Sequence, residues 1–353
     1  MIKFHPVPSA KPDTMQGDWR LGVEVCTFVI STPFYRFRET ADRQYLHDGN
    51  EIAIKADGLV RYFNGFEAVR SIDLSIRRGE IFGIVGPNGA GKTTLLKMIT
   101  GLLRPSVGKI SVLGYDSVRD TIKVKENIGY LPEEDSLYEE MSIMDYLHLF
   151  SDLYLTKRSE ADMRISENLS RLSIRNTGVV GDLSKGMKRK IAITRSLLHD
   201  PPVLIYDEPT SGLDVISIRA IIKHIKNLAR QGKTIVFSAH NMAQVEYVCD
   251  RIAIVNNGRI IALATMDELL SKYGSKKYLI DFESSENQKV PANFHAKSNQ
   301  DRGYSVQYEN IDETNALLQW LGRTGGRTLS ITTKSDSLED IFLGLVDGSH
   351  DIE

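Results

Sequence analysis

The sequence has few cysteines, no long hydrophobic run and almost no net charge. Only two cysteines occur among its 353 residues, Cys26 and Cys249, and they lie far apart. This usage is typical of a reducing compartment and provides no disulfide or zinc framework. No run of about 18 apolar residues is present, so the sequence predicts no transmembrane helix. The formal net charge of −2 gives no basic footprint, and we therefore expect no nucleic-acid partner.

Changes in composition divide the chain into three expected parts. Residues 1–50 contain four prolines and no sustained periodicity, which predicts a poorly ordered N-terminal extension. Residues 51–270 alternate short apolar strands with amphipathic helices, a pattern typical of an α/β domain with a parallel sheet. Within that range, residues 135–200 are mostly helical in pattern. The alternation restarts at residues 276–345 and predicts a small second α/β domain, with no internal repeat.

A strand, a glycine-rich loop and a helix follow one another at residues 80–103. The loop matches the G-x-x-x-x-G-K-T pattern of nucleotide hydrolases and consists of Gly86, Pro87, Asn88, Gly89, Ala90, Gly91, Lys92, Thr93 and Thr94. Glycines allow the backbone N–H groups to face phosphate oxygens, and the helix adds its positive end. We predict that Lys92 binds the β- and γ-phosphates and that the Thr93 hydroxyl binds Mg²⁺. A chance glycine turn is the alternative, and the flanking strand and helix disfavour it.

Two carboxylates, Asp207 and Glu208, end the apolar run at residues 203–206. Such a run predicts a central parallel strand buried on both faces, and ligands bind at the carboxyl ends of these strands. Alone, Asp207 could be a turn cap and Glu208 a solvated acid. Beside a phosphate loop, we predict instead that Asp207 holds Mg²⁺ and that Glu208 is the general base for the attacking water. His240 ends the next strand, where a structural role is the alternative to contact with the γ-phosphate.

With three further motifs, these residues resemble the nucleotide-binding subunits of ATP-binding-cassette transporters. Residues 183–187, LSKGM, look like the signature loop of that family, and residues 211–214, SGLD, resemble its D-loop. His240 stands where the family has its switch histidine. Phe63 takes the place of the aromatic residue that stacks on adenine, with Tyr62 beside it as a competitor. The resemblance covers residues 52–265 strongly, and residues 276–345 weakly as the accessory domain of some exporter subunits.

The resemblance implies an α/β fold of the P-loop NTPase class with ATP-binding-cassette architecture. That architecture combines a parallel-sheet core, an antiparallel β-subdomain and a helical subdomain, here with a small C-terminal α/β domain. It implies ATP and Mg²⁺ as cofactors and ATP hydrolysis as the activity. The implied catalytic residues are Glu208 and His240, and the implied metal ligands are Thr93, Glu133 and Asp207. Residues implied to bind nucleotide beyond the phosphate loop are Phe63, Glu133, Ser184, Gly186 and Asp214.

The same resemblance implies partners and a location. The signature loop of one cassette completes the ATP site of another, so a homodimer or a paired second cassette is expected. An integral-membrane permease would supply the pore and dock near residues 133–146. The protein would then be cytoplasmic and peripheral on the inner face of the cell membrane, and its transport direction would be export. The transported substrate is not encoded in this chain.

Two positions depart from the usual motifs of the family. The signature loop usually reads LSGGQ, but here Lys185 replaces the first glycine and Met187 the glutamine. Ser184 and Gly186 keep the hydroxyl and the close backbone approach. Glu133 stands where the family usually has glutamine, so it adds negative charge beside the phosphates and puts the usual coupling of that loop in doubt.

Other functions of cassette ATPases are less compatible with the sequence. A chromosome-maintenance ATPase would carry a long coiled coil between Lys92 and Asp207, and no sustained heptads occur there. A translation-factor type would need two cassettes. A binding module that uses ATP only as a switch would lack the base Glu208. A soluble cassette ATPase without a permease, in cluster assembly or regulation, stays open as the alternative.

Overall fold

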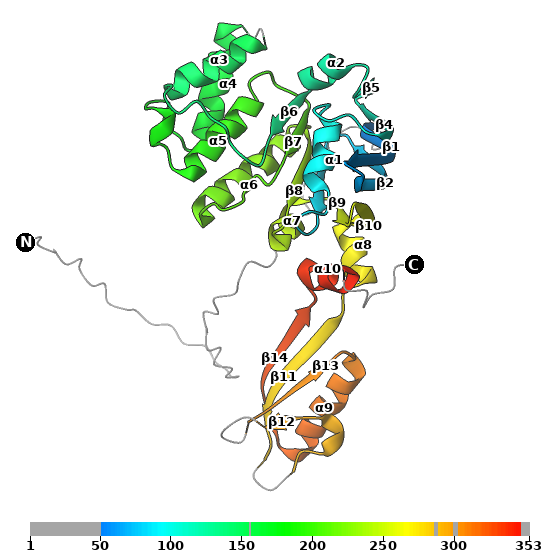
Figure 1. Cartoon of the computed structure of the whole chain (residues 1–353). Coiled ribbons are helices and arrows are strands. Elements are labelled where there is room, and N and C mark those ends of the chain that lie inside the picture. Colours follow the sequence, from blue (N-terminus) through cyan, green and yellow to red (C-terminus); the bar gives the residue numbers. More distant parts are fainter. Residues whose placement is uncertain (1–50, 155–156, 286–288, 299–302, 347–353) are drawn as a thin grey trace, which may run out of the picture. The chain divides into compact units, whose positions relative to one another are not determined.

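The computed structural model describes residues 51–154, 157–285, 289–298 and 303–346 (Figure 1). The N-terminal extension expected at residues 1–50 lies outside the described residues. The described part contains three sheets. Two of them build the cassette and the third belongs to the C-terminal region.

A six-stranded sheet forms the centre of the cassette, in the order β10-β9-β3-β8-β7-β6. Its strands are β3 (Ile81–Val85), β6 (Ile128–Leu131), β7 (Val203–Tyr206), β8 (Thr234–Ala239), β9 (Arg251–Asn256) and β10 (Arg259–Thr265). All neighbouring pairs are parallel except β9 and β10. Every residue of β3, β7 and β8 is buried, because packed side chains cover both faces of the sheet.

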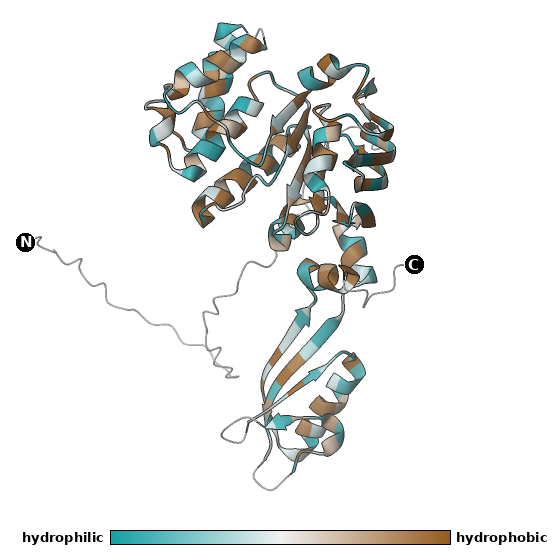
Figure 2. Ribbon diagram, viewed as in Figure 1, coloured by the Kyte–Doolittle hydropathy of each residue, from teal (hydrophilic) through white to brown (hydrophobic). Residues whose placement is uncertain are grey.

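The two faces of this sheet belong to two hydrophobic clusters. In β3, Ile81 and Val85 join a cluster with the helices α5 (Lys185–Ser196), α6 (Val215–Arg230) and α7 (Met242–Val248). Phe82 and Ile84 point to the other face and pack with α1 (Lys92–Ile99) and the antiparallel sheet. Hydrophobic residues run along the central strands and alternate with hydrophilic ones on the helices (Figure 2).

The second sheet is antiparallel and has the order β2-β1-β4-β5. It consists of β1 (Ile52–Phe63), β2 (Phe66–Arg77), β4 (Val107–Val112) and β5 (Tyr115–Asp116), and the short helix α2 (Thr121–Glu126) follows it. Alternating residues of β1, such as Ile54, Ala56 and Leu59, are buried in the second cluster. This sheet is the predicted antiparallel β-subdomain.

The helical subdomain lies between β6 and β7. It contains α3 (Ile143–Leu153), α4 (Arg158–Arg171), the 3₁₀ turn Val180–Asp182 and α5. Ser142 and Ser184 cap α3 and α5, because their side chains accept hydrogen bonds from the backbone N–H groups of Asp145 and Met187. The sequence pattern predicts one apolar face of α3 with Met144, Leu147 and Phe150. Leu147 is buried and the other two are partly buried, while Ile143 and Tyr146 complete the buried face.

The C-terminal region begins after α8 (Met266–Lys272). Its sheet has the order β12-β13-β11-β14, all antiparallel. The elements are β11 (Lys276–Glu283), the 3₁₀ turn Ala292–Phe294, β12 (Lys297–Ser298), β13 (Gly303–Tyr308), α9 (Ile311–Thr324), β14 (Arg327–Ser335) and α10 (Leu338–Val346). Leu317 and Leu321 of α9 cover Ile280 and Phe282 of β11 and form a separate small core. The predicted fold class is therefore confirmed in all four parts.

The last helix, α10, packs against the cassette rather than against this small core. Leu338, Ile341 and Leu345 are buried in the cluster that also contains Val245 of α7 and Leu269 of α8. The backbone N–H of Leu338 also donates to the Glu246 carboxylate at 3.4 Å. The C-terminal helix thus completes the core of the cassette.

The segment between α8 and α10 leaves and rejoins the cassette at one point. Asp336 Oδ2 accepts hydrogen bonds from the backbone N–H and the hydroxyl of Ser275, at 2.9 and 2.6 Å. The backbone N–H of Asp336 donates to the Ser275 carbonyl at 3.0 Å. Residues 276–335 therefore form an excursion whose two ends are tied together.

This arrangement predicts different outcomes for two deletions. Replacing residues 276–335 by two glycines should leave the melting temperature nearly unchanged, because α10 can still pack against the cassette. Deleting residues 276–353 removes three buried aliphatic side chains, each worth about 1.5–3 kcal/mol, and should lower the melting temperature strongly. Thermal unfolding followed by circular dichroism measures both. Equal losses in the two variants would show that α10 does not stabilise the cassette.

Candidate nucleotide site

The phosphate loop connects β3 to α1, and two of its glycines are required by geometry. A Cβ atom at Gly86 would lie 2.1 Å from the Val255 carbonyl oxygen, so no larger residue fits. Gly91 has a φ of 103°, and a Cβ there would meet the Ala68 carbonyl oxygen at 2.6 Å. The backbone N–H of Gly258, in the β9–β10 turn, donates to the Ala90 carbonyl at 3.0 Å. The loop is therefore held from both sheets.

Lys92 is buried at the start of α1 and has mainly backbone partners. Its Nζ donates to the carbonyl oxygens of Gly86 at 2.7 Å and Pro87 at 3.2 Å, and lies 4.0 Å from Glu208 Oε1. Burial lowers the pKa of Lys92, while the carboxylates of Glu208, Asp207 and Glu133 act to raise it. A buried ammonium group at a helix N-terminus is well suited to bind the phosphates of a nucleotide.

Asp207 follows β7 and is fully buried. Its Oδ1 accepts a hydrogen bond from Ser238 Oγ at 2.6 Å. Its Oδ2 has no hydrogen-bond partner among the described residues, although a buried carboxylate oxygen needs one. Mg²⁺ prefers oxygen ligands, and Oδ2 of Asp207 and the Thr93 hydroxyl at the start of α1 are oxygen atoms of that kind.

Glu208 adopts a left-handed backbone conformation, with a φ of 47°. This conformation costs a non-glycine residue about 1–2 kcal/mol, and it persists only where the surrounding contacts fix it. The Ser238 hydroxyl accepts from the backbone N–H of Glu208 at 2.9 Å. The Glu208 carboxylate Oε2 lies 2.8 Å from Nδ1 of His240, which follows β8. The structure thus brings together Lys92, Asp207, Glu208 and His240, as the sequence predicts.

Ser184 and Gly186 stand at the N-terminus of α5, and Gly186 packs against the start of α6 in the same chain. A Cβ atom at Gly186 would lie 2.3 Å from Ser217 Oγ and 3.2 Å from Asp214 Oδ2. Asp214 caps α6, and hydrogen bonds from Ser217 lower the pKa of its carboxyl group. Among the described residues, no hydrogen bond or ion pair joins these signature and D-loop residues to the phosphate loop. Their nucleotide-binding roles stay predictions.

The aromatic position at the end of β1 offers two exposed rings. Phe63 pairs with Phe66 across the β1–β2 hairpin, and the Arg61 guanidinium lies 4.6 Å from the centre of its ring. Tyr62 is exposed as well. Because both rings are accessible, the assignment of adenine stacking to Phe63 rather than Tyr62 stays a prediction.

One buried residue near these carboxylates was missed by the sequence analysis. Arg189, on α5, is 3% exposed and donates six hydrogen bonds to the loops that follow β6 and β7. One of its acceptors is the backbone carbonyl of Glu133, at 3.1 Å. In the sequence Arg189 lies between Lys188 and Lys190 and resembles part of a solvated basic face, so no sequence signal distinguishes it.

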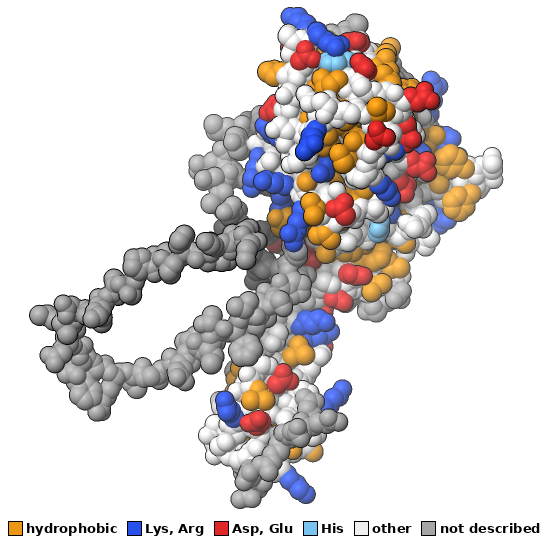
Figure 3. Space-filling view, turned by 90° about the vertical axis from the view of Figure 1, so that its left-hand side faces the viewer, with side chains coloured by type: hydrophobic (Ala, Val, Ile, Leu, Met, Phe, Trp, Pro, Cys, Tyr) orange, Lys and Arg blue, Asp and Glu red, His pale blue; other side chains and the backbone are white. Residues whose placement is uncertain are grey.

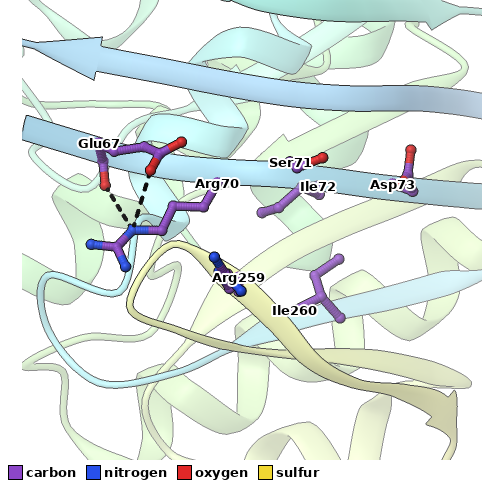
Figure 4. A pocket seen from close by; sticks show the side chains of 7 residues that line it. All are labelled: Glu67, Arg70, Ser71, Ile72, Asp73, Arg259 and Ile260. Carbon is purple, nitrogen blue, oxygen red and sulfur yellow. Dashed lines mark hydrogen bonds and ion pairs between the residues drawn. The ribbon is translucent and has the colours of Figure 1, made fainter.

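A separate pocket of about 450 Å³ lies between β2 and β10 (Figure 4). It is lined by Glu67, Arg70, Ser71, Ile72, Asp73, Arg259 and Ile260. Arg70 forms an ion pair with Glu67, with Nε and Oε2 3.8 Å apart. None of these residues belongs to the phosphate loop, the signature loop, the D-loop, or the positions of Asp207, Glu208 and His240.

On the face shown in Figure 3, basic and acidic side chains are intermixed.

Comparisons with known proteins agree with this geometry. The ABC transporter family profile matches residues 69–211, and the profile of the ATP-binding protein DrrA1-3-like, C-terminal domain matches residues 265–346. The ABC transporter ATP-binding protein NatA of Bacillus subtilis is 42% identical over 206 residues, covering 58% of this chain and 84% of that protein. The linearmycin resistance ATP-binding protein LnrL of Bacillus subtilis is 37% identical over 223 residues, covering 63% and 72%.

A third relative and a solved structure extend these comparisons. The daunorubicin resistance ATP-binding protein DrrA3 of Streptomyces coeruleorubidus is 36% identical over 229 residues, covering 64% of this chain and 72% of that protein. A solved structure described as an ATP binding subunit of an ABC transporter has a TM-score of 0.59 and 31% identity, and covers 63% of this chain and 93% of its own. The chain belongs to the family of ATP-binding subunits of ABC transporters, and its activity is ATP hydrolysis.

No helix in the described ranges has the length and apolar character needed to cross a membrane.

Replacing Lys92 by alanine should weaken ATP binding about tenfold to a hundredfold, because each hydrogen bond to a charged group contributes about 1.5–3 kcal/mol. Lys97→Ala is the matched control, since Lys97 is exposed on the same helix. Titration with a fluorescent ATP analogue measures both affinities. An unchanged affinity in Lys92→Ala would contradict the phosphate-loop assignment.

Replacing His240 by alanine should leave ATP affinity nearly unchanged and reduce the turnover number. The loss should be about 10²-fold if the ring stabilises charge that develops on the γ-phosphate. His295→Ala, an exposed histidine of the C-terminal region, serves as the control. Steady-state ATPase assays decide the point, and wild-type turnover in His240→Ala would assign the ring a structural role.

Proposed function

We propose that this chain is the ATP-hydrolysing motor of an exporter and that it works as a pair of identical cassettes bound to a separate membrane permease. One observation carries the pairing. The groups suited to phosphate, metal ion and water lie together around Lys92 and Glu208, whereas among the described residues no hydrogen bond or ion pair joins the signature residues Ser184 and Gly186 to the phosphate loop. A second copy would supply the missing side of each ATP site.

The residues around Lys92 have distinct roles in this proposal. Lys92 and the loop amides hold the β- and γ-phosphates, and α1 adds the positive end of its dipole. Thr93, Asp207 and Glu133 hold Mg²⁺, which would neutralise the charge of the phosphates. Glu208 accepts the proton of the attacking water, and His240, whose Nδ1 lies 2.8 Å from that carboxylate, contacts the γ-phosphate.

The names of the relatives support the direction of transport. LnrL and DrrA3 are named for resistance to linearmycin and daunorubicin, and the C-terminal region matches a DrrA-like profile. Export is therefore the favoured direction, with the cargo selected by the permease. A cassette ATPase without a permease, in cluster assembly or regulation, is the alternative. Copurification of a polytopic membrane subunit from solubilised membranes would distinguish the two.

The domain division is part of the same proposal. Residues 51–270 form the nucleotide-binding domain with its helical subdomain at about residues 135–200, and residues 276–345 form the C-terminal region, whose last helix, α10, packs on the cassette. The permease would contact the loop at residues 133–146, where Tyr138 exposes 57% of its surface. The subunit would then lie on the cytoplasmic face of the membrane.

Glu208→Gln tests the pairing directly. The substitution removes the base but keeps the shape of the side chain, so hydrolysis should fall by about 10² to 10⁴. Lys92 and the loop amides are unchanged, so Mg-ATP should stay bound between two chains. We expect a dimer with Mg-ATP in size-exclusion chromatography with light scattering, and mostly monomer for the wild type after turnover.

A second substitution checks that the dimer uses the signature loop. Ser184→Arg, added to Glu208→Gln, places a bulky cation in the facing site and should return the protein to a monomer. Normal hydrolysis in Glu208→Gln would show that the base lies elsewhere. An inactive, ATP-bound monomer would show that this chain needs a different partner cassette or its membrane subunit to close.

A further inference from the structure

Arg189 connects three consecutive peptide carbonyls around the general base. Its Nη2 donates to the carbonyl oxygens of Asp207 at 2.6 Å and Glu208 at 2.8 Å, and its Nε donates to that of Pro209 at 3.1 Å. Consecutive carbonyls of an extended strand point in alternate directions and would not meet one cation. The left-handed conformation of Glu208 lets these three converge.

The same guanidinium group also holds the loop that follows β6. Its Nη1 donates to the carbonyl oxygens of Pro132 at 2.6 Å and Glu133 at 3.1 Å. The Asp135 carboxylate balances its charge, with Oδ1 2.6 Å from Nη1. Arg189 itself belongs to α5, which begins just after Ser184. One side chain thus joins the helix of the signature loop to the two loops that carry Glu208 and Glu133.

The chemistry of arginine suits this position. Its planar fork carries five N–H donors and stays charged when buried, whereas a lysine has three donors at a single point. Within the described ranges, Arg189 forms no hydrogen bond or ion pair with Lys92, Thr93 or His240, so it lies outside the groups that would touch the nucleotide. Any effect on hydrolysis must therefore pass through the backbone that Arg189 holds.

We propose that Arg189 is a positioning residue for hydrolysis, which fixes Glu208 in its left-handed conformation so that the carboxylate faces His240. This inference rests on the proposed role of Glu208 as the base. It goes beyond that role by naming the side chain that holds the base in place and joins it to the signature helix and the Glu133 loop.

Arg189→Met removes the donors but keeps a long apolar side chain in the buried space. The turnover number at saturating Mg-ATP should fall at least about tenfold, because a small displacement of a catalytic group costs up to about 10²-fold. The dissociation constant for ATP should change less than about threefold, since the phosphate loop is not touched. Arg195→Met is the matched control, because Arg195 lies on the same helix and donates to the Tyr146 hydroxyl, at 2.7 Å, in the helical subdomain.

A double-mutant cycle with Glu208→Gln separates positioning from general destabilisation. If Arg189 acts through Glu208, the pair Arg189→Met/Glu208→Gln should hydrolyse ATP at the rate of Glu208→Gln alone in single-turnover assays. Independent, additive losses would overturn the proposal, as would an equal loss of turnover in Arg195→Met.

A conservative variant keeps the test decisive if Arg189→Met does not fold. Arg189→Lys retains the charge and up to three donors but not the planar fork, so turnover should lie between those of the wild type and Glu208→Gln, with ATP affinity preserved. Wild-type turnover in Arg189→Lys would overturn the proposal. Normal turnover in Glu208→Gln would instead refute the role of Glu208 itself, which distinguishes failure of the proposed function from failure of this inference.

Discussion

A buried lysine surrounded by carboxylates is the constraint on which the rest of this cassette depends. The ammonium group of Lys92 is removed from water, and in the chain itself it is hydrogen-bonded to two loop carbonyls and lies near acids that follow β7 and β6. Burying such a charge is costly unless its partners are held rigidly. The close packing of Gly86 against β9 and of Gly91 against β2 provides that rigidity.

The acidic side of this cluster is held with equal precision, but from other elements. Ser238 of β8 accepts from the Glu208 backbone and donates to the Asp207 carboxylate, so the strand next to β7 holds both residues. Arg189 holds the backbone carbonyls of the same two residues. The charges that would bind phosphate, metal ion and water are therefore positioned by backbone contacts, which side-chain motion alone does not loosen.

Much of this architecture was predictable because it depends on local pattern. The apolar run at residues 203–206 predicted β7 with the observed boundaries, since a strand buried on both faces needs a continuous hydrophobic sequence. The site residues Lys92, Asp207, Glu208 and His240 were predictable because each stands beside a strand whose end lies at the same edge of one sheet.

What the sequence did not indicate depends on contacts between distant segments. The short helices α7 and α8 give too few turns for a periodic signal. Arg189 resembles a surface residue because its acceptors lie more than fifty positions upstream and almost twenty downstream. The proposed pairing of two chains follows from the family resemblance and not from local pattern, and the predicted roles of Ser184, Gly186 and Asp214 depend on it.

The packing of α10 connects the C-terminal region to the helix that follows His240, because both helices contribute to one hydrophobic cluster. The helix α7 begins two residues after His240 and has only seven residues, which is too short to be stable by itself. Its buried side chains Val245 and Val248 belong to the cluster that Leu338, Ile341 and Leu345 complete. Without α10 that cluster would be open to water on one side. The helix that follows His240 therefore packs against a helix nearly a hundred residues further along the chain, and the excursion at residues 276–335 lies between α8 and that last helix.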